Sequence, residues 1–218
     1  LTLYVPGRKQ PLLLPAGSEP WEHSTGEYLI TTKGDPKKVN AIVAPSGGII
    51  GGSQNVGWLA QITSAEVINH RLWLRNDQGD VVNIVDASGK ALLNQKNGSA
   101  LDGSRIEPLY VRNDVTSAQS PLALIRPESG SGKNGAGFLR PDGSLQLDSK
   151  WQDIQSADAD GNIEQFIVRT AEGTGVVDAQ GKIVIPLTED NISPFVHGYA
   201  LDYLDGKLTA LDHAGKHY

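Results

Sequence analysis

The chain has 218 residues and a formal net charge of −6, with 25 glycines, 12 prolines and no cysteine or methionine. The absence of cysteine excludes disulfides, thiolate nucleophiles, iron–sulfur clusters and cysteine-based zinc sites. Only Lys33, Lys37 and Lys38 form a basic cluster, so nucleic acid is not expected as a partner. The longest apolar runs, at residues 12–14 and 183–185, are too short for a membrane span.

The same composition bears on the compartment. A chain without cysteine fits a periplasmic or secreted bacterial protein, although a cytosolic protein can lack cysteine too. No charged-then-apolar signal peptide is visible, and the chain begins at Leu1 without an initiator methionine. We therefore expect a mature or trimmed chain from the bacterial envelope or the medium.

Short extended segments alternate with glycine turns along the chain. Five segments share an apolar run, a polar turn that ends in glycine, and a second extended run. They occupy residues 42–50, 84–93, 138–147, 175–186 and 210–218. Their turn glycines stand 34 to 54 residues apart, at Gly47, Gly89, Gly143, Gly181 and Gly215. Self-similarity at such a period is typical of repeat folds.

The chemistry of this turn predicts a hairpin. In three copies an aspartate stands three residues before the glycine, as Asp86, Asp178 and Asp212. An aspartate at the first position of a type I turn accepts hydrogen bonds from the amides that follow it. The glycine then adopts a positive φ without steric cost. We expect each copy to join two antiparallel strands.

Each hairpin follows a further strand rich in aromatic and β-branched residues, so the unit is a meander of at least three strands. We expect one all-β domain with a strand region at 1–26. Its units are predicted at residues 27–70, 71–119, 120–163, 164–198 and 199–218. The longest glycine step is ascribed to a turn-rich insertion at 94–119, and residues 63–70 are compatible with one or two helical turns.

A unit of about 40 residues cannot bury both faces of its own sheet, so neighbouring units must stack. This predicts tandem antiparallel meanders in a propeller-like ring. An open β-repeat spiral explains the repeats equally well. For the ring, we expect residues 1–5 to supply the strand that the last unit lacks.

The best-formed units resemble a known family. Residues 195–216, FVHGYALDYLDGKLTALDHAGK, combine a lead-in through Gly198 and Ala200, a Gly-Lys turn and an Asp-x-x-Gly-Lys hairpin. This pattern is similar to WG-type repeats, which occur mostly in bacterial proteins, and it is clearest over residues 174–216. The Trp-Gly pair of the family is replaced by Thr174-Gly175 and Ala136-Gly137. The resemblance implies a repeat scaffold that acts as a binding module, and it brings no catalytic residues. We also expect no cofactor-binding residues.

One acidic segment is a candidate metal site. Carboxylate and amide oxygens alternate around Gly161 and are candidate calcium ligands, namely Asp158, Asp160, Asn162 and Glu164. The glycine and glutamate come earlier than in an EF-hand loop. The same residue types also suit a plain hairpin turn, so both interpretations stay open.

The four tryptophans divide into packing and binding candidates. Trp58 and Trp151 each follow a hairpin and precede an isoleucine, so we expect them to pack between units. Trp21 lies in the proline-rich acidic segment EPWEH, and Trp73 lies in a strand that can face either way. Trp21 and Trp73 are therefore the candidates for contact with a protein partner or a sugar ring.

These observations favour a non-catalytic β-repeat scaffold that binds a protein partner. One form of the hypothesis is an inhibitor or immunity-type envelope protein whose acidic loops block an enzyme. The alternative is a carbohydrate-binding or glycoside-hydrolysing β-propeller, in which two carboxyl groups flank the scissile bond. In that case a glycan is the partner.

Overall fold

The structure is a computed structural model of the whole chain. It describes residues 2–4, 9–14, 16–22, 28–44, 46, 48–51, 56–93, 101, 103–110, 120–128, 134–158, 164–188, 191–204 and 206–218. The chain divides into two compact units, Leu1–Asn94 and Gln95–Tyr218, and each is described by itself. In the part described, no helix is long and apolar enough to cross a membrane.

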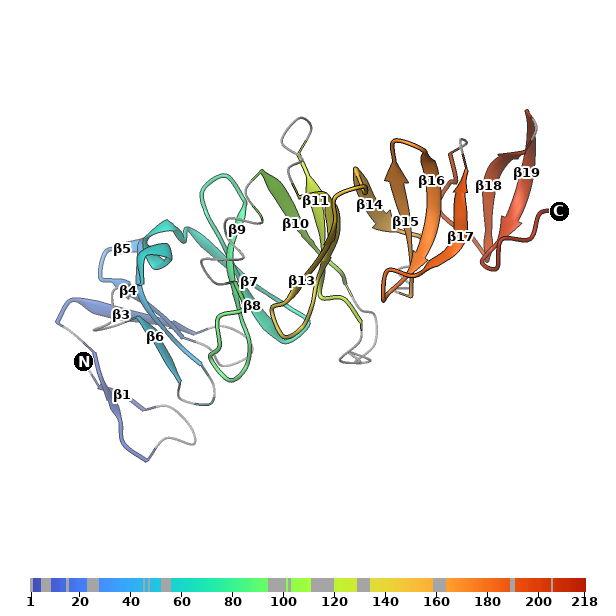
Figure 1. Cartoon of the computed structure of the whole chain (residues 1–218). Helices are drawn as coiled ribbons and strands as arrows, with labels where there is room; N and C mark the ends of the chain where they lie inside the picture. The colour runs from blue at the N-terminus through green and yellow to red at the C-terminus, as the bar shows by residue number, and fades with distance from the viewer. Residues whose placement is uncertain are drawn as a thin grey trace. The chain divides into compact units, whose positions relative to one another are not determined.

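Among its described residues, the first unit contains three antiparallel sheets and one short 3-10 helix (Figure 1). Its elements are β1 (Thr2–Leu3), β2 (Leu12–Leu13), β3 (Ser18–Glu22), β4 (Tyr28–Thr32), β5 (Asp35–Val43), β6 (Ile49–Gly51), η1 (Gly57–Gln61), β7 (Ser64–Ile68), β8 (Arg71–Arg75) and β9 (Val81–Val85). Strands β1–β2, β3–β6 and β7–β9 form the sheets, each in chain order.

The part of the second unit that the structure describes forms two four-stranded sheets and one hairpin, again antiparallel and in chain order. Its strands are β10 (Ser104–Pro108), β11 (Ala123–Pro127), β12 (Ala136–Leu139), β13 (Leu145–Asp148), β14 (Asp153–Ser156), β15 (Gln165–Thr170), β16 (Gly173–Asp178), β17 (Ile183–Thr188), β18 (Tyr199–Leu204) and β19 (Lys207–Asp212). The sheets are β10–β13, β14–β17 and β18–β19. The prediction of tandem antiparallel meanders is confirmed.

Consecutive sheets pack face to face within each unit, because side chains of a strand alternate between its two faces. On β15, Phe166 and Val168 join a core with Phe138 of β12, whereas Ile167 joins a core with Leu211 of β19. In the first unit, β3–β6 packs likewise against β1–β2 on one face and against β7–β9 on the other. Each central sheet therefore has two buried faces.

The aspartate turn forms as the sequence predicts. Asp178 Oδ1 accepts hydrogen bonds from the amides of Gln180 and Lys182, at 2.9 and 2.8 Å. The Gly181 amide donates to the Asp178 carbonyl at 2.9 Å, and the φ of Gly181 is 81°. The turns at Asp86 and Asp212 have the same bonds. Gly47 lies outside the described residues.

A second kind of glycine is required inside a strand. A Cβ on Gly137 of β12 would stand 2.0 Å from the carbonyl oxygen of Gln146 on β13. The corresponding distance from Gly175 of β16 to the oxygen of Ile185 on β17 is 2.9 Å. These are the glycines of the two modified Trp-Gly pairs, and the close approach of the next strand explains why a side chain is absent there.

Two local expectations are wrong. Residues 64–68 form strand β7, because they pair along their length with β8, and the helical turn is η1 instead. The segment 94–119 is not only an insertion, since β10 lies within it and pairs with β11. A single buried side chain, Ile106, stands between charged neighbours in β10, so the segment lacks an apolar run.

The strand expected to close a ring has another partner. In β1, Thr2 pairs with Leu13 and Leu3 pairs with Leu12 of β2. In the last sheet, β19 pairs with β18, and the bridge between His217 and Leu211 occupies its other edge. The expectation that residues 1–5 complete the last sheet is therefore not met, and closure of the repeats into a ring stays a prediction.

Candidate functional site

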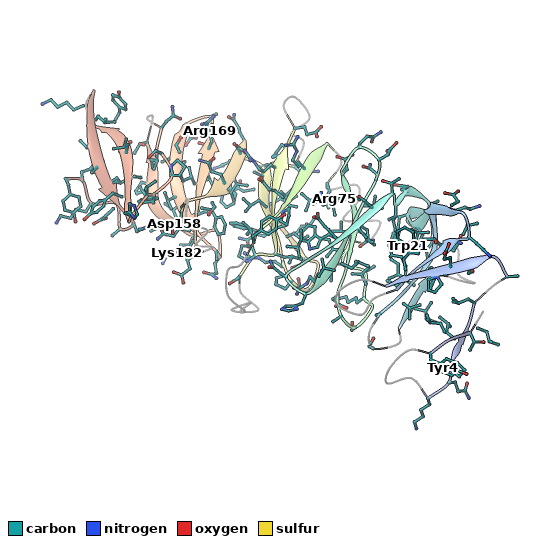
Figure 2. All side chains as sticks on the ribbon, turned by 180° about the vertical axis from the view of Figure 1, so that it is seen from behind. Tyr4, Trp21, Arg75, Asp158, Arg169 and Lys182 are labelled. Carbon is teal, nitrogen blue, oxygen red and sulfur yellow. The ribbon has the colours of Figure 1, made fainter. Side chains whose placement is uncertain are left out.

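The two candidate binding tryptophans differ in exposure. Trp21, labelled on β3 in Figure 2, is 50% exposed and can contact a partner. Trp73 of β8 is completely buried, and its indole Nε1 donates to the carbonyl of Ile68 at 3.3 Å. The prediction that Trp73 contacts a partner is therefore wrong, because its side chain is not exposed. Partner binding by Trp21 stays a prediction.

The other two tryptophans pack between consecutive sheets, as expected. Trp151 stands just before β14, and its ring meets Phe138 of β12 edge-on at 6.0 Å. Phe138 also meets Phe166 of β15 at 4.8 Å. Trp58 of η1 is partly buried against the core between β3–β6 and β7–β9.

The acidic segment is described only at its ends. Asp160 and Asn162 lie outside the described residues. Asp158 makes an ion pair with His213, and the backbone carbonyl of Glu164 accepts from the Ala179 amide. Among the residues described, no group of three His, Asp or Glu side chains could hold a metal ion. A calcium site at this segment stays a prediction.

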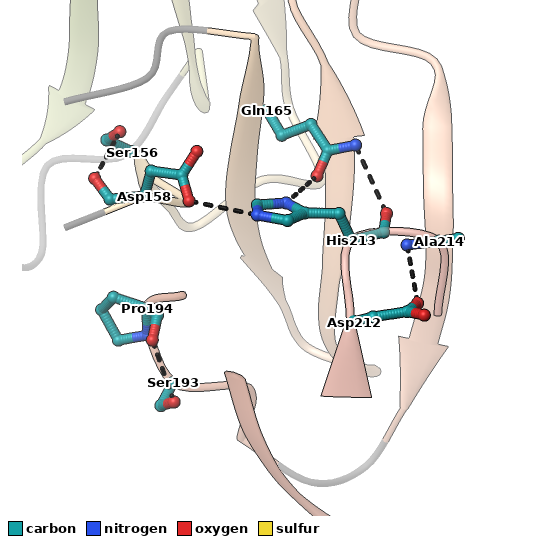
Figure 3. Close-up of polar contacts among 8 residues, drawn as sticks. All are labelled: Ser156, Asp158, Gln165, Ser193, Pro194, Asp212, His213 and Ala214. Carbon is teal, nitrogen blue, oxygen red and sulfur yellow. Dashed lines mark hydrogen bonds and ion pairs between the residues drawn. The ribbon is translucent and has the colours of Figure 1, made fainter. Parts of the chain in front are cut away.

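His213, in the Asp212 turn, contacts side chains of the preceding sheet (Figure 3). His213 Nε2 lies 3.2 Å from Asp158 Oδ1, and Nδ1 lies 2.9 Å from Gln165 Oε1. The imidazole stacks on Phe195 with a centroid distance of 4.1 Å. Because both ring nitrogens are engaged, neither is available to take a proton from a substrate. The arrangement is a structural connection between β14–β17 and β18–β19.

A second histidine is held in a similar way. Thr209 Oγ1 lies 2.9 Å from His217 Nδ1, and Nε2 of the same ring lies 3.6 Å from the buried carboxylate of Asp202. The threonine hydroxyl also donates to the Asp202 carbonyl at 3.3 Å. A nucleophile must be open to a substrate, whereas this hydroxyl is used inside the sheet. These contacts among Thr209, His217 and Asp202 therefore hold the last residues of the chain against β19.

The strongest candidate site is a groove of about 730 Å³ where β10–β13 meets β14–β17. We call it the arginine groove. Its lining includes three arginines from three different strands, together with an aspartate, a glutamate and a tryptophan, namely Arg105, Arg126, Arg169, Asp153, Glu128 and Trp151.

Strand pairing places these charged residues side by side in two cross-strand pairs. Arg105 of β10 stands directly opposite Arg126 of β11, and Asp153 of β14 stands directly opposite Arg169 of β15. An ion pair between Arg126 and Asp153 joins the two sheets. Arg105 and Arg169 are thus the cross-strand neighbours of the two members of this ion pair.

The ion pair between Arg126 and Asp153 is satisfied within the protein. Arg126 binds Asp153 through two parallel hydrogen bonds of 2.8 and 3.0 Å, and its third nitrogen donates to Glu107 at 3.0 Å. The hydrogen bond to Asp153 outweighs burial and, with Glu107, raises the pKa of Arg126 above its ordinary value. Arg126 is therefore a fixed cation in which each of the three guanidinium nitrogens already bonds a carboxylate.

The two outer arginines, Arg105 and Arg169, differ from Arg126 in having no such partners in the part of the chain that the structure describes. Among the described residues, neither Arg105 nor Arg169 has an acidic partner or a side-chain hydrogen bond. Arg105 faces another cation across the strands, which is unfavourable without a counter-charge. Arg169 faces Asp153, both of whose oxygens bond to Arg126. Both guanidinium groups are free to bind an anion.

Sequence reasoning missed this groove, although two of its members lie in strands that were expected. A basic cluster is visible in a sequence only when its members are neighbours along the chain, whereas these arginines are 21 and 43 residues apart. Their common signal is a cation near the end of a β-branched strand, as in ALIRP and QFIVRT. Models of known protein families do not match the chain, and a sequence search of characterised proteins finds no match either.

Proposed function

We propose that the protein is a non-catalytic β-repeat scaffold that binds a protein partner, and that the arginine groove receives an acidic segment of that partner. The observation that carries the proposal is the pair of unpartnered guanidinium groups, Arg105 and Arg169, which are the cross-strand neighbours of a neutralised pair. Arginine binds carboxylates through two parallel hydrogen bonds, and Arg126 already binds Asp153 in this manner.

The setting of the groove also favours binding over catalysis. Its arginines belong to paired strands above a packed aromatic core, so the backbone that carries them is already ordered before a ligand binds. A glycosidase needs one carboxylic acid that stays protonated. Asp153 and Glu107 both accept hydrogen bonds from the Arg126 guanidinium, so these two carboxyl groups are already engaged within the protein. The alternative of a glycoside hydrolase has no such support here.

The resemblance to WG repeats agrees with a binding scaffold and stays a prediction, as does the bacterial envelope location. In an inhibitor or immunity-type role, the groove would bind an acidic segment of the target. Since the whole chain carries a net charge of −6, attraction of an acidic partner must act at short range.

The test is binding of fluorescein-labelled hexaglutamate, followed by fluorescence anisotropy at low salt. We expect measurable binding to the full chain and none of hexaglutamine. Arg105→Gln and Arg169→Gln should each weaken binding about fivefold, since a charge-assisted hydrogen bond contributes about 1 kcal/mol or more. Lys182→Gln removes one exposed cation from the same unit outside the groove and should leave binding unchanged.

Two results would overturn the proposal. One is the absence of hexaglutamate binding at millimolar concentration. The other is an equal loss of affinity in Lys182→Gln, which would show nonspecific attraction. Oligogalacturonate, tested in parallel, distinguishes the carbohydrate alternative: binding of that acidic sugar alone would replace a protein partner by a glycan.

A further inference from the structure

The β18–β19 hairpin has one exposed apolar face. On β18, exposed Tyr199, Leu201 and Tyr203 alternate with buried Ala200 and Asp202. The register sets β19 residues and the end of the chain on the same face. We call this surface the tyrosine face; it consists of Tyr199, Leu201, Tyr203, Leu208, Ala210 and Tyr218.

The repeat shows what this face corresponds to. The turn aspartates Asp178 and Asp212 align the two sheets with a shift of 34 residues. With that shift, Leu201 corresponds to Ile167, Ala210 to Val176, and Tyr218 to Val184. These three counterparts in β14–β17 lie in the core that β18–β19 covers. The tyrosine face is therefore the equivalent of a surface that is buried one sheet earlier.

The aromatic part of the face is already ordered. The Tyr218 hydroxyl donates to Asp212 Oδ2 at 3.0 Å, and this bond raises the pKa of the phenol. The Tyr218 ring meets Tyr199 edge-on at 5.8 Å, and the Lys216 ammonium lies 4.6 Å from its centroid. Side chains fixed in this way lose little conformational freedom on association. Tyrosine is also enriched at protein interfaces.

We propose that the tyrosine face binds the tyrosine face of a second copy of the chain, in a closed two-fold dimer. Its five large side chains are each 50–61% exposed. They offer roughly 500–600 Å² per copy, so two faces with their rim reach about 1,200 Å², the lower end of specific interfaces. The margin carries both Lys216 and Asp212, so two copies can meet without an excess of like charge. In such a dimer the apolar side chains of the tyrosine face are buried against a sheet, as the corresponding side chains of β14–β17 are buried against β18–β19.

The test is sedimentation equilibrium of the full chain between 1 and 500 µM. We expect the mass to rise with concentration from one chain to two. Leu201→Glu puts a charge at the centre of the face and should weaken dimerisation at least thirtyfold. Ile183→Glu is the matched control, because Ile183 is 57% exposed on β17 and lies outside the face; it should leave the dimer intact.

Thermal unfolding shows whether each variant is folded, and hexaglutamate binding shows whether the groove is intact in Leu201→Glu. A wild-type chain that stays monomeric at 500 µM would overturn the proposal. So would a folded Leu201→Glu variant that still dimerises. A mass that continues to rise beyond two chains would replace the closed dimer by head-to-tail stacking.

Discussion

The intrastrand glycine of β12 allows a quantitative test of the fold. A Cβ at Gly137 would stand 2.0 Å from the Gln146 carbonyl oxygen and 2.8 Å from the Leu147 Cα. Contacts below 3.0 Å are not found for real Cβ atoms, so in Gly137→Ala β12 and β13 must separate by about 1 Å or more. Phe138 and Leu139 are completely buried, so β12 cannot move away without opening the core.

The expected cost has two parts. Overpacking contributes about 1–3 kcal/mol. Loss of one or two strand hydrogen bonds adds about 1 kcal/mol each. We expect Gly137→Ala to lower the free energy of unfolding by about 3 kcal/mol and the Tm of the second unit by about 10 °C.

The assay is urea and thermal unfolding by circular dichroism, with hydrogen exchange of β12 and β13 to locate the effect. Gly175→Ala, where the nearest carbonyl oxygen is 2.9 Å away, should cost less. Gly57→Ala is the control, because a Cβ there meets nothing within 4 Å. If Gly137→Ala unfolds within 0.5 kcal/mol of the wild type, the close approach of β13 does not explain the glycine.

Two further changes test the hairpin and the buried indole. Asp86→Ala removes an acceptor of bonds from Ser88 and Lys90 and should cost about 1–2 kcal/mol at pH 7. Burial raises the pKa of Asp86, but these hydrogen bonds and the Lys90 charge lower it overall. The stability that the Asp86 carboxylate contributes is therefore present above pH about 4 and is lost as the pH falls through its lowered pKa. An unchanged difference in unfolding free energy between wild type and Asp86→Ala at pH 2 would contradict this account. Trp73→Phe removes the indole donor to the Ile68 carbonyl and buried packing volume, and should cost about 2 kcal/mol in urea unfolding; a neutral effect would show that the indole bond contributes nothing.

The hairpins could be predicted because their cause is local. An aspartate and a glycine three residues apart suffice to set the turn at Asp86, Asp178 and Asp212, whatever the surrounding sheet does. Strand β10 could not be found in the same way, since Ile106 alone contributes to its buried pattern and the partner strand supplies the rest. The burial of Trp73 could not be predicted either, because the sequence LWL is equally compatible with a strand that has one buried face and with a strand that has two.

The arginine groove depends on contacts between sheets. Arg126 and Asp153 meet because β11 and β14 belong to stacked sheets, and nothing in the intervening 26 residues indicates that contact. Arg105 and Arg169 become significant only when the carboxylates used by Arg126 are known. Sequence patterns specify turns and strands, whereas a binding site of this kind needs the order of stacking.

The stacking of sheets in chain order also determines how the molecule can fold. In the second unit, the cores join β10–β13 to β14–β17, and β14–β17 to β18–β19. Contacts between neighbours along the chain require closure of only short loops, so a meander can form early and serve as a template for the next. Unfolding should then begin at the β18–β19 hairpin, which has one sheet neighbour in its core, and proceed inward. Hydrogen exchange should record this order as protection that rises from β19 toward β15.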